Sequence, residues 1–143
     1  MIEQHCKVRT LIGGDVEGNI LILEEPISFW GGVDTQSGNI IDCNHPQCGD
    51  CIRDTLLVLP GTRGSTASPG ALLEMLAADI GPKGFILTAE DSVCLVAASM
   101  CTALGRRSPS VVEIPQTQIP TWQNGELWRI ENHQLFLLAT TTR

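Results

Sequence analysis

The stretch from Pro60 to Gly70 brings together residues that could hold an anion and move a proton. Arg63 offers a fixed positive charge and a planar set of donors that suits a carboxylate or a phosphate. Glycines in the stretch expose backbone N–H groups, and Ser65 places a hydroxyl among them. The alternative is a tight polar turn that only joins two elements. Because a guanidinium, glycines and several hydroxyls converge here, we favour a binding or catalytic loop.

Two predicted elements position this loop. The apolar run from Leu56 to Leu59 indicates a buried strand before it, and apolar residues at helical spacing over 69–80 indicate a helix after it. Ser68 is expected to cap that helix, and Pro69 suits its first helical position. Gly81 is expected to take the left-handed conformation that ends the helix. The loop would therefore lie at the positive end of a helix dipole, where anions bind.

The rest of the chain predicts an α/β fold. After the first helix, strands at 84–88 and 111–114 alternate with a second helix over about 92–104, which is typical of βαβ units with parallel strands. Further short β-rich runs lie outside this unit, at 7–12, 19–23, 38–42, 126–130 and 135–139. The first two of them are expected to form a hairpin or to be neighbouring strands. We predict one domain over residues 1–143, with a central parallel βαβαβ unit and additional β-strands at both ends.

The second helix carries signals at both of its ends. Asp91 or Ser92 is placed to cap its first turn, and Gly105 is placed to close its last turn. Its apolar residues form one stripe that is expected to face the core, at Val93, Val96, Ala97, Met100 and Leu104.

Composition excludes several classes of function. The net charge of −7 argues against nucleic acid and anionic membranes as partners, because neither supplies the cations that this surface would attract. No apolar run approaches the ~20 residues that a membrane span needs. No signal peptide is evident at the N-terminus. The sequence therefore predicts a cytoplasmic protein whose six cysteines are reduced thiols.

Four motifs, taken together and in order, resemble the small subunit of the aconitase X family. They are Pro26–Asp34, Gly38–Asp42, His45-Pro46 and Arg63–Ser68. The resemblance runs from about Lys7 to Gly105, although Thr35 stands where the family usually has proline. It implies a swivelling β/β/α domain that closes over an active site lying mainly on a larger iron–sulfur subunit. No cofactor is expected on this chain itself.

The function that this resemblance implies is a hydro-lyase that is active only with the large subunit. Family substrates are cis-3-hydroxy-L-proline and phosphomevalonate, and the absence of an extra basic cluster in this sequence favours the first. The general base of the family falls on Ser65, while iron on the partner would polarise the leaving hydroxyl as a Lewis acid. Arg63 could stabilise the serine alkoxide or clamp the substrate carboxylate. The residues expected to bind substrate are Arg63, Gly64, Thr66, Ser68 and His45.

Three cysteines form a competing signal. The first three spacings of a plant-type [2Fe–2S] ferredoxin occur at Cys43, Cys48 and Cys51. A fourth ligand would have to be Cys94 or Cys101, which the second helix places on or beside its buried side. The family carries its iron ligands on the large subunit, and it usually has small or polar residues at the second and third of these positions. Thiols without a metal are therefore favoured.

Several features admit more than one interpretation. His45 could approach the active site or cap a turn, and Asp34 with Asp42 could be paired carboxylates or turn caps. Trp30 could be a core aromatic beside a tight turn or part of the wall between subunits, and we favour the core, while the glycines after it indicate a close backbone approach. The whole chain could instead be a non-catalytic module that holds a small anion for regulation, or a stand-alone [2Fe–2S] protein.

Overall fold

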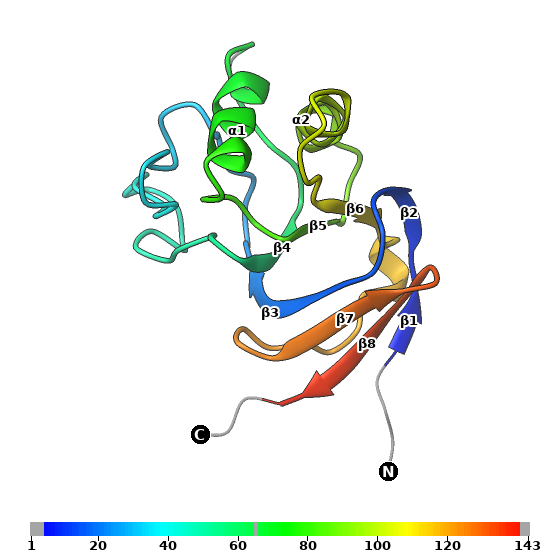
Figure 1. The fold of residues 1–143 in the computed structure, drawn as a ribbon. Helices are drawn as coiled ribbons and strands as arrows, with labels where there is room; N and C mark the ends of the chain where they lie inside the picture. Colours follow the sequence, from blue (N-terminus) through cyan, green and yellow to red (C-terminus); the bar gives the residue numbers. More distant parts are fainter. Residues whose placement is uncertain (1–4, 65, 141–143) are drawn as a thin grey trace.

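The computed structural model describes residues 5–64 and 66–140. Within these residues, the strands form one eight-stranded sheet in the order β1-β8-β7-β3-β4-β5-β6-β2, and two helices cover one of its faces (Figure 1). The strands are β1 (His5–Lys7), β2 (Arg9–Ile12), β3 (Val16–Ile22), β4 (Thr55–Leu59), β5 (Gly84–Leu87), β6 (Ser110–Glu113), β7 (Leu127–Glu131) and β8 (Gln134–Ala139). The helices are α1 (Ser68–Ala77), α2 (Ser92–Ala103) and the short 3-10 helix η1 (Gln116–Gln118).

The centre of the sheet is parallel, as predicted. β3, β4, β5 and β6 run in the same direction, with Leu56 opposite Gly84 and Phe85 opposite Val111. α1 connects β4 to β5, and α2 connects β5 to β6, so both crossovers lie on one face (Figure 1). The continuous apolar runs of β4 and β5 fit this position, because both faces of a central parallel strand are covered. The predicted βαβαβ unit is confirmed.

The sheet curls until its two ends meet at Val8. β1 pairs antiparallel with β8 at one end of the strand order, and β2 pairs antiparallel with β6 at the other end. Only Val8 separates β1 from β2, and its N–H donates to the carbonyl of His133 at 2.9 Å. The predicted pairing of the runs 7–12 and 19–23 is therefore wrong, since β3 pairs with β4 and β7 instead.

Alternate side chains of the strands build two separate cores, as the two-residue period of a strand requires. The core inside the curl includes Ile20, Leu56, Val58, Ile86, Val112 and Trp128. The core between sheet and helices includes Leu57, Leu59, Phe85 and Leu87 from the strands, with Leu72, Met75 and Ala97 from the helices. The second core fixes where β4 ends relative to where α1 begins, so it also fixes the two ends of the loop between them.

The chain between β3 and β4 forms turns. The strand expected at 38–42 is wrong, because this part of the chain contains only isolated bridges, from Val33 to Ile40 and from Asn39 to Cys51. Phe29 and Ile52 anchor the segment through side chains that are buried in the core between sheet and helices. The segment therefore packs beside α1 without adding a strand to the sheet (Figure 1).

α1 begins and ends differently from the prediction. Ala67 occupies the N-cap position and Ser68 is the first helical residue, so the expected cap by Ser68 is wrong. Asp79 takes the left-handed conformation after the last turn, with a φ of 59°, in place of Gly81. Gly81 lies instead against the side chain of Leu76: an added Cβ would lie 2.5 Å from Cδ2 of Leu76, so the leucine would have to shift.

α2 begins and ends as predicted but presents another face to the core. Asp91 caps its first turn, and Gly105 follows its last turn with a φ of 71°. Its buried residues are small: Cys94, Ala97, Ala98 and Cys101. Three members of the predicted core stripe are instead exposed, at Val96, Met100 and Leu104. Across the described part of the chain, neither helix is long and apolar enough to cross a membrane.

Candidate functional site

The loop from Pro60 to Ala67 leaves the carboxyl end of β4 and enters the N-terminus of α1. Ligands of α/β sheets bind in the crevice beside the carboxyl ends of the parallel strands, so this is the edge where a site is expected. Ser65 lies outside the described residues, and its role stays a prediction. The residues on both sides of it are described, and they define the surroundings of the loop.

Arg63 is available to a ligand. Its backbone N–H donates to the carbonyl of Ile27 at 3.1 Å, which fixes the chain next to the segment before β4. Its guanidinium forms an ion pair with Glu25 at 3.4 Å, and both side chains are more than half exposed. Exposed ion pairs contribute little to stability, so an anionic ligand could compete with Glu25 for the guanidinium.

Gly64 lies in a space that admits no side chain. Its φ is 117°, and an added Cβ would lie 2.7 Å from Oγ of Ser28 and 3.6 Å from Oγ of Ser68. Ser28 in turn donates to the carbonyl of Trp30 at 2.9 Å. The loop therefore brings the backbone of one glycine close to two hydroxyls, which come from segments far apart in the sequence. Sequence reasoning missed Ser28, although it lies within the motif Pro26–Asp34.

Ser68 is buried at the start of α1, and its hydroxyl does not cap the helix. Its side chain is 1% exposed, and its Oγ has no hydrogen-bond partner among the residues that the structure describes. The N–H groups of Ser68 and Gly70 belong to the first turn of α1 and have no acceptor within the helix. A buried polar group without a partner costs about 1–3 kcal/mol, so a group that completes its hydrogen bonds is expected here.

A single carboxylate joins the loop to α2. Oδ1 of Asp91 accepts hydrogen bonds from the backbone N–H of Thr62 at 3.0 Å and from its hydroxyl at 2.5 Å. Oδ2 of Asp91 accepts from the N–H of Cys94 at 3.0 Å, which caps α2. The sequence predicted the cap. It gave no signal for the contact with Thr62, because the two residues are 29 positions apart.

His45 occupies a structural position. The ring is 4% exposed, Nδ1 accepts from the N–H of Gln47 at 3.0 Å, and Nε2 lies 3.0 Å from the carbonyl of Glu25. With Nδ1 acting as acceptor, Nε2 carries the proton and donates to Glu25. Both ring nitrogens are thus engaged by the backbone, which favours the turn-capping interpretation. His45 still bears on the loop, since it holds the backbone of the residue whose carboxylate pairs with Arg63.

Asp34 and Asp42 also cap turns. The carboxylate of Asp34 accepts from the N–H of Gln36 at 3.0 Å and from the hydroxyl of Ser37 at 2.7 Å, and these two donors lower the pKa of Asp34 below its ordinary value. Asp42 accepts from the N–H of Asn44 at 3.0 Å. These local contacts explain both residues without a paired carboxylate site.

Trp30 is 61% exposed, so its expected place in the core is wrong. The glycine prediction beside it is confirmed at Gly32, where an added Cβ would collide with the carbonyl oxygen of Ser28. The backbone of this segment folds back on itself tightly, and that fold leaves the indole in solvent.

Apart from Cys6, which is half-buried, the cysteines divide into exposed and buried thiols. Cys43, Cys48 and Cys51 are exposed and free. Within residues 5–64 and 66–140, no group of three His, Cys, Asp or Glu side chains is arranged to hold a metal ion. Cys94 is buried on α2, and burial, with a further contribution from Asp91, raises the pKa of its thiol well above the ordinary value.

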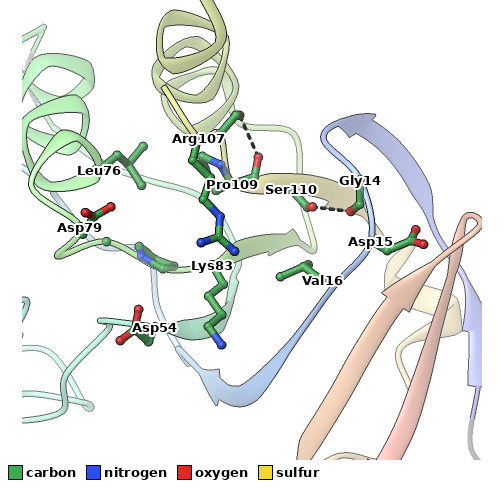
Figure 2. Close-up of a pocket in the computed structure, with 13 residues that line it drawn as sticks. Gly14, Asp15, Val16, Asp54, Leu76, Asp79, Lys83, Arg107, Pro109 and Ser110 are labelled. Atoms are coloured by element: carbon green, nitrogen blue, oxygen red, sulfur yellow. Dashed lines mark hydrogen bonds between the residues drawn. The ribbon is translucent and has the colours of Figure 1, made fainter. Parts of the chain in front are cut away.

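A pocket of about 160 Å³ lies at the opposite edge of the parallel strands (Figure 2). It opens where β5 and β6 begin and α1 ends, and the charged side chains around it are those of Asp15, Asp54, Asp79, Lys83 and Arg107. None of the residues predicted to bind substrate lines it. The pocket therefore does not form part of the candidate site.

Comparison with known proteins points to one family. A family model for the aconitase X swivel domain matches residues 5–138. The chain is 33% identical over 113 residues to a cis-3-hydroxy-L-proline dehydratase of Hypocrea jecorina, a match that covers 79% of this chain but only 19% of that protein. It is 26% identical over 137 residues to a phosphomevalonate dehydratase small subunit of Methanococcoides burtonii, a match that covers 96% of each. Its fold matches the crystal structure of Thermococcus kodakaraensis aconitase X in its holo-form with a TM-score of 0.80, at 23% identity, over 94% of this chain and 98% of that one.

Proposed function

Because the chain belongs to the aconitase X swivel-domain family, we propose that it is the small part of a hydro-lyase that dehydrates a hydroxy acid. In this proposal residues 1–143 form one swivelling domain, which closes over an active site that a larger partner chain supplies. The Methanococcoides burtonii relative supports such a partner, because it is named a small subunit and the match covers 96% of each chain.

The observation that carries this proposal is the buried hydroxyl of Ser68 at the N-terminus of α1, which has no partner among residues 5–64 and 66–140. It lies beside Gly64, beneath a loop that also presents Arg63. N–H groups of the first helical turn, a hydroxyl and a guanidinium are all donors, and a carboxylate or a developing alkoxide accepts from such groups. The same donors suit the substrate and the base that must act on it.

In the proposed reaction Ser65 removes the proton next to the substrate carboxylate. A serine hydroxyl is a weak base, so its alkoxide needs donors that are already in place. The first turn of α1 supplies N–H groups, and Arg63 supplies a positive charge, either to the alkoxide or to the substrate carboxylate. Thr66 and Ser68 offer further hydroxyls to the substrate.

The iron–sulfur centre of the family belongs to the partner in this proposal. The described residues do not fit such a centre, since no three suitable ligands come together in them. The centre supplies Lewis-acid chemistry at the leaving hydroxyl when it is bound. The free thiols at Cys43, Cys48 and Cys51 support a reducing, cytoplasmic location for the complex.

We favour cis-3-hydroxy-L-proline as the substrate. Arg63 is the only cation between Pro60 and Gly70, and it already faces Glu25. One guanidinium suits a single carboxylate, whereas a phosphorylated acid would need charge for two anionic groups. Phosphomevalonate is the alternative, which the Methanococcoides burtonii relative supports by its name.

Substitution of the serine tests the proposal. The chain is mixed with its large partner, and loss of water is measured with cis-3-hydroxy-L-proline and with phosphomevalonate as substrates. Ser65→Ala is expected to lower kcat by about 10²- to 10⁴-fold with the complex intact, because it removes the proton acceptor. Thr117→Ala, on the exposed helix η1, is the matched control and should be as active as the parent.

Near-parental turnover of Ser65→Ala would remove the residue from the mechanism. A chain that forms a stable assembly of its own copies, binds small anions and gains no activity with any partner would instead favour the non-catalytic anion-binding module.

A further inference from the structure

The loop before α1 contains glycines that give its backbone conformational freedom. Gly61 and Gly64 lie on either side of Thr62 and Arg63, with φ values of 125° and 117°. Glycine gives the backbone the most conformational freedom, so this loop must be fixed by its hydrogen bonds rather than by its own stiffness. Among the described residues, the backbone N–H of Arg63 donates to the carbonyl of Ile27, and the donors of Thr62 contact Asp91, so both anchor the loop.

We propose that Asp91 is a positioning residue for the reaction, which fixes the loop at Thr62, and with it the Arg63–Gly64 stretch, against the first turn of α2. This inference rests on the proposed function. Thr62 directly precedes this stretch, and both of its polar donors end on Oδ1 of Asp91. The second carboxylate oxygen is bound to α2 through Cys94. The carboxylate of Asp91 thus links the loop to α2, and we call this link the joint.

The chemistry of the joint requires a carboxylate. Three donors converge on Asp91, two on one oxygen and one on the other. A carboxylate has acceptor sites on both oxygens, whereas an amide has one acceptor oxygen and would turn an NH₂ group toward one set of donors. The N-terminus of α2 also favours a negative charge at this position. Neutral residues can therefore cap the helix or hold the loop, but not both.

This division allows the two roles of Asp91 to be separated. Asp91→Ser keeps a good N-cap for α2, because a serine oxygen can accept from Cys94, but its shorter side chain gives up Thr62. Thr62→Val removes the hydroxyl donor from the loop side and leaves the cap untouched. Thr62→Ser keeps the hydroxyl and is the matched control. If Asp91 served only to cap α2, the two substitutions at Thr62 would not change kcat.

The experiment measures kcat and KM of the variants in the complex with the large partner. Asp91→Ser and Thr62→Val are each expected to lower kcat about tenfold or more with KM within about threefold, since the loop loses its alignment rather than its binding groups. Thr62→Ser should restore kcat to near the parental value. The double variant should be no slower than the slower single variant, because both changes break the same joint.

Amide hydrogen exchange in the same complex supplies a readout that does not depend on turnover. Exchange over residues 60–64 should accelerate in Asp91→Ser and Thr62→Val but not in Thr62→Ser, while α2 stays protected in all three. Near-parental kcat in Asp91→Ser and Thr62→Val would overturn the proposal, and so would a Thr62→Ser variant as slow as Thr62→Val. A parental complex that dehydrates no hydroxy acid would refute the proposed function. In that case the hydrogen exchange of residues 60–64 alone would test the joint: faster exchange in Asp91→Ser and Thr62→Val would support it, and unchanged exchange would refute it.

Discussion

Gly64 shows how much the candidate site depends on a missing side chain. A Cβ added to the residue would lie close to the hydroxyls of Ser28 and Ser68, and its φ of 117° is one that side-chain-bearing residues rarely adopt. A loop that brings its backbone this close to two buried or half-buried hydroxyls can present N–H groups to a small ligand without steric interference.

Gly64→Ala is therefore expected to destabilise the chain by about 1–3 kcal/mol, from backbone strain and from the contact of the new Cβ with Ser28. Gly70→Ala is the control, since an added Cβ there meets no described heavy atom within 4 Å and alanine favours a helix. Urea unfolding of both variants measures the difference. Equal stability of the two variants would contradict the conformation described for Gly64.

At the residue scale, candidate site residues could be predicted from the sequence, but the contacts between them could not. Arg63 and Asp91 could be singled out from their types and from local end signals. The contact of Thr62 with Asp91 and the approach of Ser28 to Gly64 could not, because each depends on how β4 and its neighbours are ordered in the sheet. The prediction placed Trp30 in the core, but an aromatic ring beside glycines can be either buried or exposed, and here it is exposed.

At the scale of elements, α2 is informative because it is apolar on every side. Periodicity identified the helix but could not choose between its faces, and small residues rather than large ones face the core. Cys94, Ala97 and Cys101 let the helix approach its neighbours closely, while Val96 and Met100 point outward. Interiors are close-packed, so the space available under the helix selects side chains by volume as well as by polarity.

The same arrangement predicts two classes of thiol. Cys43, Cys48 and Cys51 should react rapidly with a thiol reagent at neutral pH, because they are exposed. Cys94 and Cys101 should react only after unfolding, because they are buried, and the raised pKa of Cys94 further lowers its thiolate fraction at that pH. Titration with and without denaturant measures the two classes. Rapid reaction of Cys94 in the folded chain would contradict the packing of α2.

Element boundaries were predictable where signals are local. Strand β4, helix α2 and its caps at Asp91 and Gly105 follow from short apolar runs and turn residues. The start of α1 was not, because Ser68 turns its hydroxyl into a buried site instead of capping the helix. This departure from ordinary capping falls at the candidate site, where a functional requirement is expected to override local preference.

At the scale of the whole molecule, the main feature is the curl of the sheet, which brings β1 and β2 at the two ends of the strand order together. Val8 lies where the two ends of the strand order meet, and its side chain is 7% exposed in the core inside the curl. The order of strands could not be predicted, because β1 and β2 are adjacent in sequence yet pair with different distant strands. The parallel centre could be, since alternation of strand and helix permits few connections.

Val8→Ala is expected to lower the free energy of unfolding by about 1–2 kcal/mol, from the apolar volume lost where the ends of the sheet meet. Leu138→Ala is the control, because Leu138 is 47% exposed on β8 and its loss should change stability by less than about 0.5 kcal/mol. Thermal or urea unfolding gives both values. A Val8→Ala variant as stable as Leu138→Ala would mean that the ends of the sheet do not pack together at this residue.

The position of β1 also constrains how the chain folds as it emerges from the ribosome. His5 pairs with Phe136 and Lys7 with Gln134, so β1 has this neighbour only after β8 has been translated. The central β4-α1-β5-α2-β6 unit is made of consecutive elements and can assemble first, with the ends of the sheet joining only when translation has passed β8.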